Sequence, residues 1–464
     1  MSLTNALGTA KSGLMTNAIH TDTTARNISN ANTEGYTRKS AELVTIPAGG
    51  VYVAKIDRQV DTMLSKLDRT NVSRLSADQT IADGMKAYTD YLGQPTDEMS
   101  PVTMMANLKD SLITLSLGVS ETSSQMSVVT AARGMAENLN SLSTTLKSVG
   151  TEVEMNIRYD VADLNTALDG IADLNRRIVG EKEGTTAMVD LQDQMDDLLQ
   201  KVSEIVDIQT VTDKSGMVNV TTGGGVELVN GRFVQDVTYD SASGQITAGD
   251  VNMTPSSGNR SFSGGSLFGL FQLKNSVLPE WSADLDTMAA ALVEGFERVA
   301  PVDGTRGLFT DDGNPYDPAD ISGLASRIMV NPAVDHEAGG DPSLIQSGGD
   351  PTAPVGDPSV VDSMLALFEE KVMIPGRPFG DSPSLTKMSA SIVSAHQQAR
   401  SQADSAVSRS TTAAATISAS RENFQGVDVD TELQNLLVLE KSYAANAKVL
   451  TTVTQMMDAL LQAV

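Results

Sequence analysis

Few side chains in this sequence have the types and spacing that catalysis or metal binding requires. The three histidines, His20, His336 and His396, lie far apart along the 464 residues. His20 and His396 fall within helical patterns, where a packed or surface histidine is expected. Asp335, His336 and Glu337 are metal-ligating types, but no second spaced cluster accompanies them. We therefore expect no catalytic residue and no metal site around the histidines.

Oxygen-bearing side chains between residues 311 and 320 form a second candidate, because carboxylate and amide oxygens are the ligands that calcium prefers. The segment contains Asp311, Asp312, Asn314, Asp317 and Asp320. Their spacing does not match an EF-hand loop, and Pro315 and Pro318 favour a plain acidic turn. The glycines at 223–225 lack the Lys-Ser/Thr pair of a phosphate-binding loop, so we expect a hairpin turn and no cofactor.

The composition excludes several further classes of function. The chain has no cysteine, which excludes disulfides, thiolate metal sites and cysteine nucleophiles. With 33 basic and 59 acidic residues the formal net charge is −26, so we expect neither non-specific nucleic-acid binding nor attraction to anionic membranes. No window approaches the ~18 apolar residues of a membrane span. The N-terminus has no cationic segment before an unbroken apolar stretch, so we expect no cleavable signal peptide.

The two ends of the chain have the clearest helical patterns. The N-terminal pattern follows Leu3, Leu7, Ala10, Leu14, Ala18, Thr21, Ala25 and Ile28. The C-terminal pattern follows Leu433, Leu436, Glu440, Tyr443, Ala447, Leu450, Thr454, Met457, Leu461 and Val464. This second spacing is typical of a coiled coil. Such narrow stripes need a partner helix, either within one chain or between neighbouring subunits, and their width favours the second arrangement.

Between the ends the sequence predicts more helices and one β-rich stretch. Helical patterns cover residues 60–92, 128–178, 187–205, 267–299 and 384–424. Asp196 and Asp197 are expected on a solvated helix face. Short β-branched runs alternate with turn signals over 207–252, which predicts antiparallel hairpins. Residues 301–358 are rich in Gly, Pro and Asp, which predicts a loop-rich region with one strand over 326–332.

The expected fold class is mainly α with an inserted β-rich part. Both chain ends form a long coiled coil or helical bundle, and a small β-rich domain lies outside it. We predict three domains, each assembled from separate segments. They are a terminal helical coiled coil (1–31 with 430–464), a helical bundle (32–205 with 266–300 and 370–429) and a β-rich, loop-rich outer domain (206–265 with 301–369).

The segment RNISNANTEGYTR, residues 26–38, ends the first helix. Asn30 and Asn32 tolerate a left-handed backbone, Gly35 supplies a positive φ, and Tyr36 begins a new packed segment. This segment resembles the N-terminal signature of the bacterial flagellar axial proteins, the rod, hook and hook-associated family. Residues 426–460 (GVDVDTELQNLLVLEKSYAANAKVLTTVTQMMDAL) resemble the C-terminal signature of the same family.

Two further segments indicate which branch of the axial family this chain resembles. Residues 190–210 (DLQDQMDDLLQKVSEIVDIQT) and 264–275 (GGSLFGLFQLKN) resemble the helical region of the hook-associated branch at the hook-filament junction. The long helix predicted over 128–178 also separates this chain from hook and rod proteins, whose β-rich middle follows the N-terminal signature directly.

The resemblance implies a structural adaptor, not an enzyme, that joins hook to filament by ring-like assembly of its terminal helices. The implied partners are further copies of the chain, the hook protein, a filament-side hook-associated protein and an export chaperone at the C-terminal helix. The implied location is extracellular, at the hook-filament junction, after type III export. The expected assembly interface contains Leu3, Leu7, Leu14, Ile28, Leu436, Tyr443, Leu450, Met457 and Leu461. The expected family-motif residues are Asn27, Asn30, Asn32, Gly35, Tyr36 and Arg38.

Three alternatives stay open at the level of the sequence. The chain could be another flagellar axial protein, of hook or rod type. It could house a hydrolase in its outer domain, although residues 301–370 contain no paired catalytic constellation. It could also be a cytoplasmic coiled-coil scaffold, but that function would leave both terminal motifs unexplained.

Overall fold

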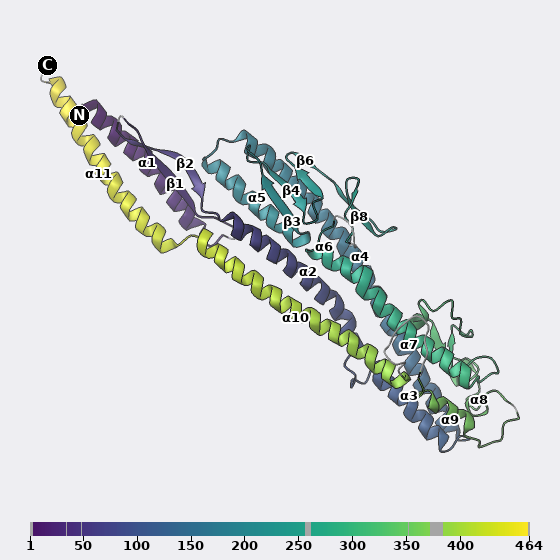
Figure 1. Ribbon diagram of the computed structural model, residues 1–464. Coiled ribbons are helices and arrows are strands. Elements are labelled where there is room, and N and C mark those ends of the chain that lie inside the picture. Colours follow the sequence, from purple (N-terminus) through teal and green to yellow (C-terminus); the bar gives the residue numbers. More distant parts are fainter. Residues whose placement is uncertain are drawn as a thin grey trace. The chain divides into compact units, whose positions relative to one another are not determined.

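The computed structural model describes residues 3–33, 35–47, 49–255, 261–350, 352–371 and 384–462 (Figure 1). Glu34 of the motif, Val464 of the C-terminal stripe and parts of the predicted outer and bundle domains (256–260, 351, 372–383) lie outside these residues. The chain divides into two compact units. The first contains Met1–Ala77, Arg158–Phe268 and Ser408–Val464, and the second contains Asp78–Ile157 and Gly269–Val407.

Helices make up most of the described chain. They are α1 (Leu3–Ser29), α2 (Thr62–Leu92), α3 (Pro101–Ser116), α4 (Thr122–Gly180), α5 (Thr186–Ile205), α6 (Ser266–Gln272), α7 (Leu278–Val299), α8 (Leu344–Ser347), α9 (Ser359–Ala366), α10 (Leu385–Gln425) and α11 (Val429–Gln462). A π-helical turn over Leu273–Val277 joins α6 to α7. None of the described helices combines the length and apolar character needed to cross a membrane.

The strands form small antiparallel sheets. They are β1 (Lys39–Thr45), β2 (Val51–Arg58), β3 (Ile208–Thr212), β4 (Val218–Thr222), β5 (Glu227–Asn230), β6 (Phe233–Val234), β7 (Val237–Asp240), β8 (Gln245–Ala248), β9 (Val251–Asn252), β10 (Phe309–Asp311) and β11 (Ile328–Val330). The sheet orders are β1-β2, β3-β4-β5-β6, β7-β8-β9 and β10-β11. The β-rich stretch therefore lies inside a mainly helical chain, which confirms the predicted fold class.

Helix α4 is unbroken over 59 residues, although its glycines at 134, 150 and 170 weaken helical propensity. Apolar side chains at three- and four-residue steps are buried along it, from Val128 to Ile178. Gly170 has a packing role, because a Cβ there would lie 2.9 Å from Cδ1 of Leu198 on α5. Tertiary burial therefore outweighs the local cost of these glycines.

In the first unit two asparagines of α4 hold the sheets by paired backbone hydrogen bonds. The buried Asn175 donates to the carbonyls of Val218 (2.8 Å) and Gly231 (2.6 Å) and accepts from the Val218 amide (2.8 Å). Asn165 donates to the Val237 carbonyl (2.8 Å) and accepts from its amide (2.9 Å). These side chains satisfy backbone groups at the strand ends facing the helix.

The second unit has an aromatic core around α7. Phe296 meets Phe309 and Phe368 edge to face, with ring centroids 5.3 and 6.3 Å apart. The Trp281 ring stacks on His396 at 4.7 Å. These rings are buried, so they supply much of the apolar area of this core.

Several elements lie where the sequence analysis predicted none, among them the short helix α8 and the strand β10. The hairpin β1-β2 directly follows the N-terminal motif, where a helical middle was expected. Most of the side chains of β1 are exposed, so the hairpin has no apolar alternation to reveal it. Helices α3 and α9 were also missed. Helix α3 has a recognisable start, since Ser100 Oγ accepts from the Val102 amide and Pro101 occupies the first turn.

Candidate assembly site at the terminal helices

Helices α1 and α11 pack side by side within the first unit, so the two ends of one chain pair with each other (Figure 1). Small and polar residues line the closest approach. Asn17 Nδ2 donates to Ser442 Oγ at 2.9 Å. A Cβ on Gly13 would lie 2.8 Å from Nδ2 of Asn446. The seam between the helices is thus narrow, and on α11 it buries Val453 but few large side chains.

The nine residues predicted for the assembly interface are distributed along this pair without being fully buried. Leu3, Leu7, Leu14, Ile28, Leu436, Leu450 and Met457 are half-buried. Tyr443 and Leu461 are exposed, at 53% and 77%. Pairing within one chain therefore leaves part of the predicted interface accessible.

A second apolar stripe of α11, which the sequence analysis did not separate from the first, is exposed. It consists of Val438, Val449, Met456 and Leu460, and we call it the outer stripe. The steps of 11, 7 and 4 residues are close to whole helical turns, so these side chains share one face. That spacing is visible in the sequence and is the signal that could have found it.

An open groove of about 570 Å³ lies between the two terminal helices. It is lined by Ala18, Thr21, Asp22, Ala25, Leu436, Leu439, Glu440 and Tyr443. Apolar and small side chains dominate it, while Asp22 and Glu440 add negative charge. A groove of this chemistry suits an amphipathic helix better than a small charged ligand.

The N-terminal motif forms a buried polar joint at the end of α1. Asn27 donates to the Lys39 carbonyl (2.9 Å) and accepts from the Lys39 amide (3.1 Å) and the Tyr36 hydroxyl (3.0 Å). Burial, followed by the carboxylates of Asp193 and Asp190, raises the pKa of Tyr36. The phenol therefore stays protonated and remains a donor to Asn27.

The other motif residues differ in their roles. Gly35 has φ +78°, as predicted, and a Cβ there would lie 2.2 Å from Oδ1 of Asp197. Asn30 and Asn32 tolerate a left-handed backbone, but neither has a positive φ in the structure. Asn30 donates to the Arg26 carbonyl through both its main-chain amide (3.0 Å) and its side-chain Nδ2 (2.9 Å), which holds the end of the helix. Asn32 is exposed.

Arg38 connects the motif to the C-terminal part of the chain. Its Nε atom donates to Oε1 of Glu432 at 2.6 Å, and its amide donates to the Gln425 carbonyl at 2.8 Å. Glu432 is 2% exposed. The motif therefore fixes the junction of α10 and α11 as well as the end of α1.

Three acids of α5 meet the basic residues of the hairpin β1-β2. Asp190 and Asp193 pair with Lys39, and Asp193 (2.8 Å) and Asp196 pair with Arg58. The solvated face predicted for Asp196 and Asp197 is confirmed in part, because Asp197 is exposed, whereas Asp196 is 37% exposed and pairs with Arg58 of the hairpin. Burial and the charges of Asp193 and Asp196 raise the pKa of Asp197.

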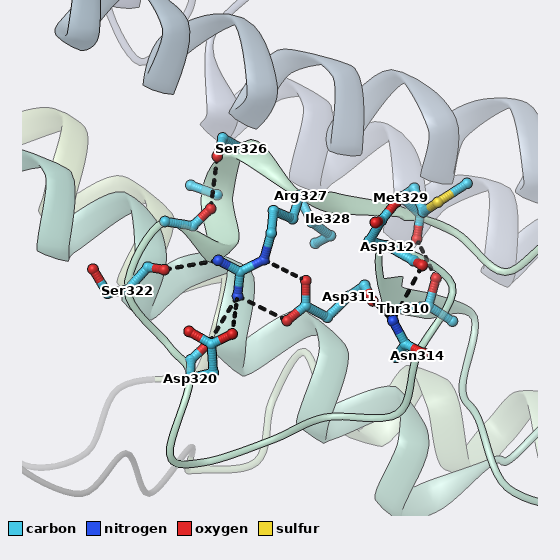
Figure 2. A network of polar contacts seen from close by, with 12 residues as sticks. Thr310, Asp311, Asp312, Asn314, Asp320, Ser322, Ser326, Arg327, Ile328 and Met329 are labelled. Atoms are coloured by element: carbon cyan, nitrogen blue, oxygen red, sulfur yellow. Dashed lines mark hydrogen bonds and ion pairs between the residues drawn. The ribbon is translucent and has the colours of Figure 1, made fainter.

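The acidic candidates of the second unit surround an arginine. Arg327 forms a bidentate pair with Asp311, at 2.7 and 2.9 Å, and also contacts Asp320 at 3.3 Å (Figure 2). Asp317 accepts from the Ala319 amide at 2.8 Å, and Asn314 donates to the Asp311 carbonyl at 3.2 Å. In the described residues no three His, Asp or Glu side chains are grouped to hold a metal ion.

The three histidines lie in separate environments. His396 is buried between the Tyr88 hydroxyl and Asp284, each at 3.2 Å. Next to His336, Asp335 and Glu337 pair with Arg133, at 2.5 and 2.6 Å. His20 is half-buried on α1. The structure therefore brings none of the histidines together.

Three family models match this chain, each in a different part. A "Flagellar hook-associated protein FlgK helical domain" matches residues 88–301. A "Flagellar basal body rod FlgEFG protein C-terminal" model matches 414–463, and a "Flagella basal body rod protein" model matches 7–37. The two rod models cover α11 and α1, the helices that pair.

Proteins similar to this chain are flagellar proteins. Flagellar hook-associated protein 1 of Bacillus subtilis is 23% identical, over 98% of this chain and 97% of the relative. The protein of the same name from Salmonella typhimurium is 25% identical, over 68% of this chain and 60% of its own length. The flagellar hook junction protein FlgK from Burkholderia pseudomallei has a solved structure similar to 53% of this chain and 46% of its own, with 20% identity and a TM-score of 0.46. In both terminal helices and in the helical middle, this chain is therefore similar to flagellar hook-associated protein 1, a structural protein of the flagellum and not an enzyme.

Proposed function

We propose that this chain joins the flagellar hook to the filament, and that its α1–α11 pairs pack against those of neighbouring copies in a ring. Similarity to the hook-associated proteins supports a structural component of the flagellum that assembles with other axial proteins. The observation that supports the ring is the outer stripe of α11, which the chain does not bury by itself.

The outer stripe leaves four apolar side chains of α11 exposed to water. Val438, Val449, Met456 and Leu460 are 46–66% exposed. Contiguous apolar patches on soluble proteins usually mark a contact with a partner. A helix that is apolar on two sides can pack on α1 within its own chain and on a neighbouring copy at the same time.

The motif joint supports this function by fixing the terminal pair to the rest of the first unit. Arg38 and Lys39 together engage Glu432 on α11 and Asp190 and Asp193 on α5. Buried polar networks with satisfied partners specify one geometry. A load applied along α1 and α11 would therefore be transmitted to the unit that contains the β-rich stretch.

The proposed partners are the hook protein on one side and a filament-side hook-associated protein on the other. We further propose that an export chaperone binds α11 before assembly, since the same exposed stripe needs cover in the bacterial cytoplasm. The chain would then be exported without a cleavable signal and end outside the cell. The division into terminal, bundle and outer domains stays a prediction, and the two segments assigned to the outer domain lie in different compact units.

Immunogold labelling of intact flagella tests the proposal. An antibody raised against the strands of 208–252 should place gold at one point between hook and filament. A strain that lacks the gene provides the control and should show no gold at that point. Gold along the whole hook would assign the chain to the hook itself. Flagella without any gold, despite detection of the chain in cells, would overturn the proposal.

A further inference from the structure

Five pairs in the sequence place Asp or Asn directly before glycine. They are Asp83–Gly84, Asp169–Gly170, Asn230–Gly231, Asp303–Gly304 and Asp312–Gly313. In such a pair the glycine amide nitrogen can attack the side-chain carbonyl carbon of the preceding residue, because glycine has no Cβ to obstruct the approach. This attack closes a five-membered ring. In a folded protein it requires that neither the glycine amide nor the preceding side chain is held by hydrogen bonds or packing.

Two of the five pairs lie inside helices. Asp83–Gly84 belongs to α2 and Asp169–Gly170 to α4, where regular helical hydrogen bonds hold the glycine amides. Gly84 is also packed, since a Cβ there would lie 2.2 Å from Cδ1 of Leu273. Ring closure at either site would require local unfolding of a long helix.

Hydrogen bonds restrain two more pairs. The Gly231 amide donates to Asn219 Oδ1 at 2.7 Å, and Asn230 Nδ2 donates to Glu227 at 3.1 Å. The Asp303 carboxylate accepts from the amides of Thr305 (3.1 Å) and Arg306 (2.7 Å) and from the Arg306 side chain. A carboxylate held as the anion is a poor electrophile, since ring closure proceeds through the neutral acid.

Asp312–Gly313 differs from these four pairs. It forms the centre of a tight turn in which the Asn314 amide donates to the Asp311 carbonyl at 2.8 Å. Both central residues have positive φ, +49° at Asp312 and +80° at Gly313, as in a type I′ turn. Asp312 is exposed, and no atom lies within 4 Å of where a Gly313 Cβ would be. Within the described residues no partner is recorded for the Asp312 carboxylate or the Gly313 amide.

We propose that Asp312 is a site of spontaneous isoaspartate formation in the folded chain. The Gly313 amide nitrogen loses its proton to water and forms a bond to Cγ of the protonated Asp312 carboxyl group. Loss of one water molecule closes a five-membered cyclic imide. Addition of water to the main-chain carbonyl carbon then breaks its bond to nitrogen, so the chain continues through Cγ. The reaction is redox-neutral, and the product has the mass of the starting chain.

The product also changes the turn in a defined way. An L-residue at φ +49° lies in the left-handed region that side chains disfavour. The extra main-chain methylene of isoaspartate relieves this restriction. Asp311, the preceding residue, holds Arg327 by two hydrogen bonds, and Figure 2 shows Asp312 beside this pair. A longer turn would therefore disturb the anchoring of β10 by Arg327.

Tryptic peptide mapping after prolonged incubation of the full folded chain at neutral pH tests this proposal. Cleavage after Lys and Arg places the five pairs on five separate peptides: 75–86, 159–176, 215–232, 299–306 and 307–327. Peptide 307–327 should accumulate isoaspartate several-fold faster than the other four, measured by isoaspartate methyltransferase labelling and by fragment ions specific to the isomer. A parallel sample in guanidinium should remove this ranking, with Asn230–Gly231 leading.

Two variants test the proposal without relying on methyltransferase labelling alone. Asp312→Asn retains a residue suited to the turn and should deamidate at the same position, which gives a mass change. Asp312→Ser removes the carboxyl group without creating a new Asp–Gly pair, so it should abolish isoaspartate in peptide 307–327 while the circular dichroism spectrum is unchanged. Equal rates in 307–327 and 299–306 of the folded chain would overturn the proposal, as would persistence of isoaspartate in peptide 307–327 of Asp312→Ser.

Discussion

The guanidinium Nε of Arg38 lies 2.6 Å from Oε1 of Glu432, a residue 394 positions further along the chain. Arg38 is the last residue of the N-terminal motif, and Glu432 lies in the first turn of α11. The glutamate is almost completely buried, so the arginine is required to balance its charge. This ion pair ties the segment after the first helix to the last helix.

Replacing Arg38 with Ala should therefore destabilise the first unit. Removing one partner of a buried pair leaves the other charge uncompensated, at a cost of about 3 kcal/mol. Denaturant unfolding of the full chain measures the change. Arg26→Ala is the matched control, because its pair with Asp22 is exposed and should contribute less than about 1 kcal/mol. If both variants lost the same unfolding free energy, burial of the Arg38–Glu432 pair would not determine its contribution to stability.

Charges placed in the outer stripe should prevent assembly without unfolding the chain. Val449→Asp and Met456→Asp introduce a carboxylate on the exposed apolar face, so a neighbouring copy could no longer cover it without burying a charge. Motility and filament length measure assembly, and circular dichroism measures folding. Gln455→Asp, on an exposed polar position of the same helix, should assemble normally.

Charges on the inner side of α11 should also block assembly. Leu450→Asp and Met457→Asp affect half-buried side chains of the predicted interface, so we expect loss of filaments from a chain whose middle remains folded. Limited proteolysis should show release of the terminal helices in these two variants but not in Val449→Asp. Normal filaments from any of the four variants would show that the terminal stripes are not the assembly interface.

Gly35→Ala and Gly8→Ala should have opposite effects on stability. Gly35 has φ +78°, and its Cβ would clash with Asp197, so the alanine variant should lose more than about 1 kcal/mol. Gly8 lies in α1 with open space around it, and alanine there should add up to about 1 kcal/mol. Thermal unfolding compares the two. A stabilised Gly35→Ala variant would show that position 35 accepts a Cβ without strain.

Asn175→Ala should weaken the attachment of the β-rich stretch to α4. Three hydrogen bonds would be lost, leaving buried backbone groups of Val218 and Gly231 unsatisfied, at a cost of about 3 kcal/mol. Asn165→Ala removes two bonds at a half-buried position and should cost less. Hydrogen exchange at the Val218 and Val237 amides distinguishes the two variants, since each should accelerate only its own amide.

Asp303 should make the folding stability of the second unit depend on pH in the acidic range. Burial acts to raise its pKa, but hydrogen bonds from Arg306, Thr305 and Asn331 outweigh it and lower the pKa to about 2. A depressed folded-state pKa adds stability above the unfolded value of about 4, and this stability is lost as the pH falls from about 4 to about 2. Asp303→Asn should be less stable at pH 7 and show a smaller decrease over that range. Parallel curves of Tm against pH would contradict this assignment.

Local patterns in the sequence determined much of this protein. Apolar spacing predicted α1, α2, α4, α5, α7, α10 and α11, because a helical face must repeat every three or four residues whatever it packs against. Turn residues predicted the hairpins of 207–252, and the terminal motifs indicated the similarity to flagellar proteins. The hairpin β1-β2 was not predictable in this way, since its mostly exposed strands have no burial period.

Only the tertiary structure decided which distant residues meet. The sequence could not show that Arg38 pairs with Glu432, that Asp193 joins Lys39 and Arg58, or that Asp311 and Asp320 pair with Arg327. The spacing of charged residues in the sequence does not reveal which of them form ion pairs. In this acidic chain each basic residue also has many acidic residues as potential partners. Ion pairs, close approaches at glycine and the exposure of one apolar stripe depend on how helices pack, and packing is a property of the whole chain.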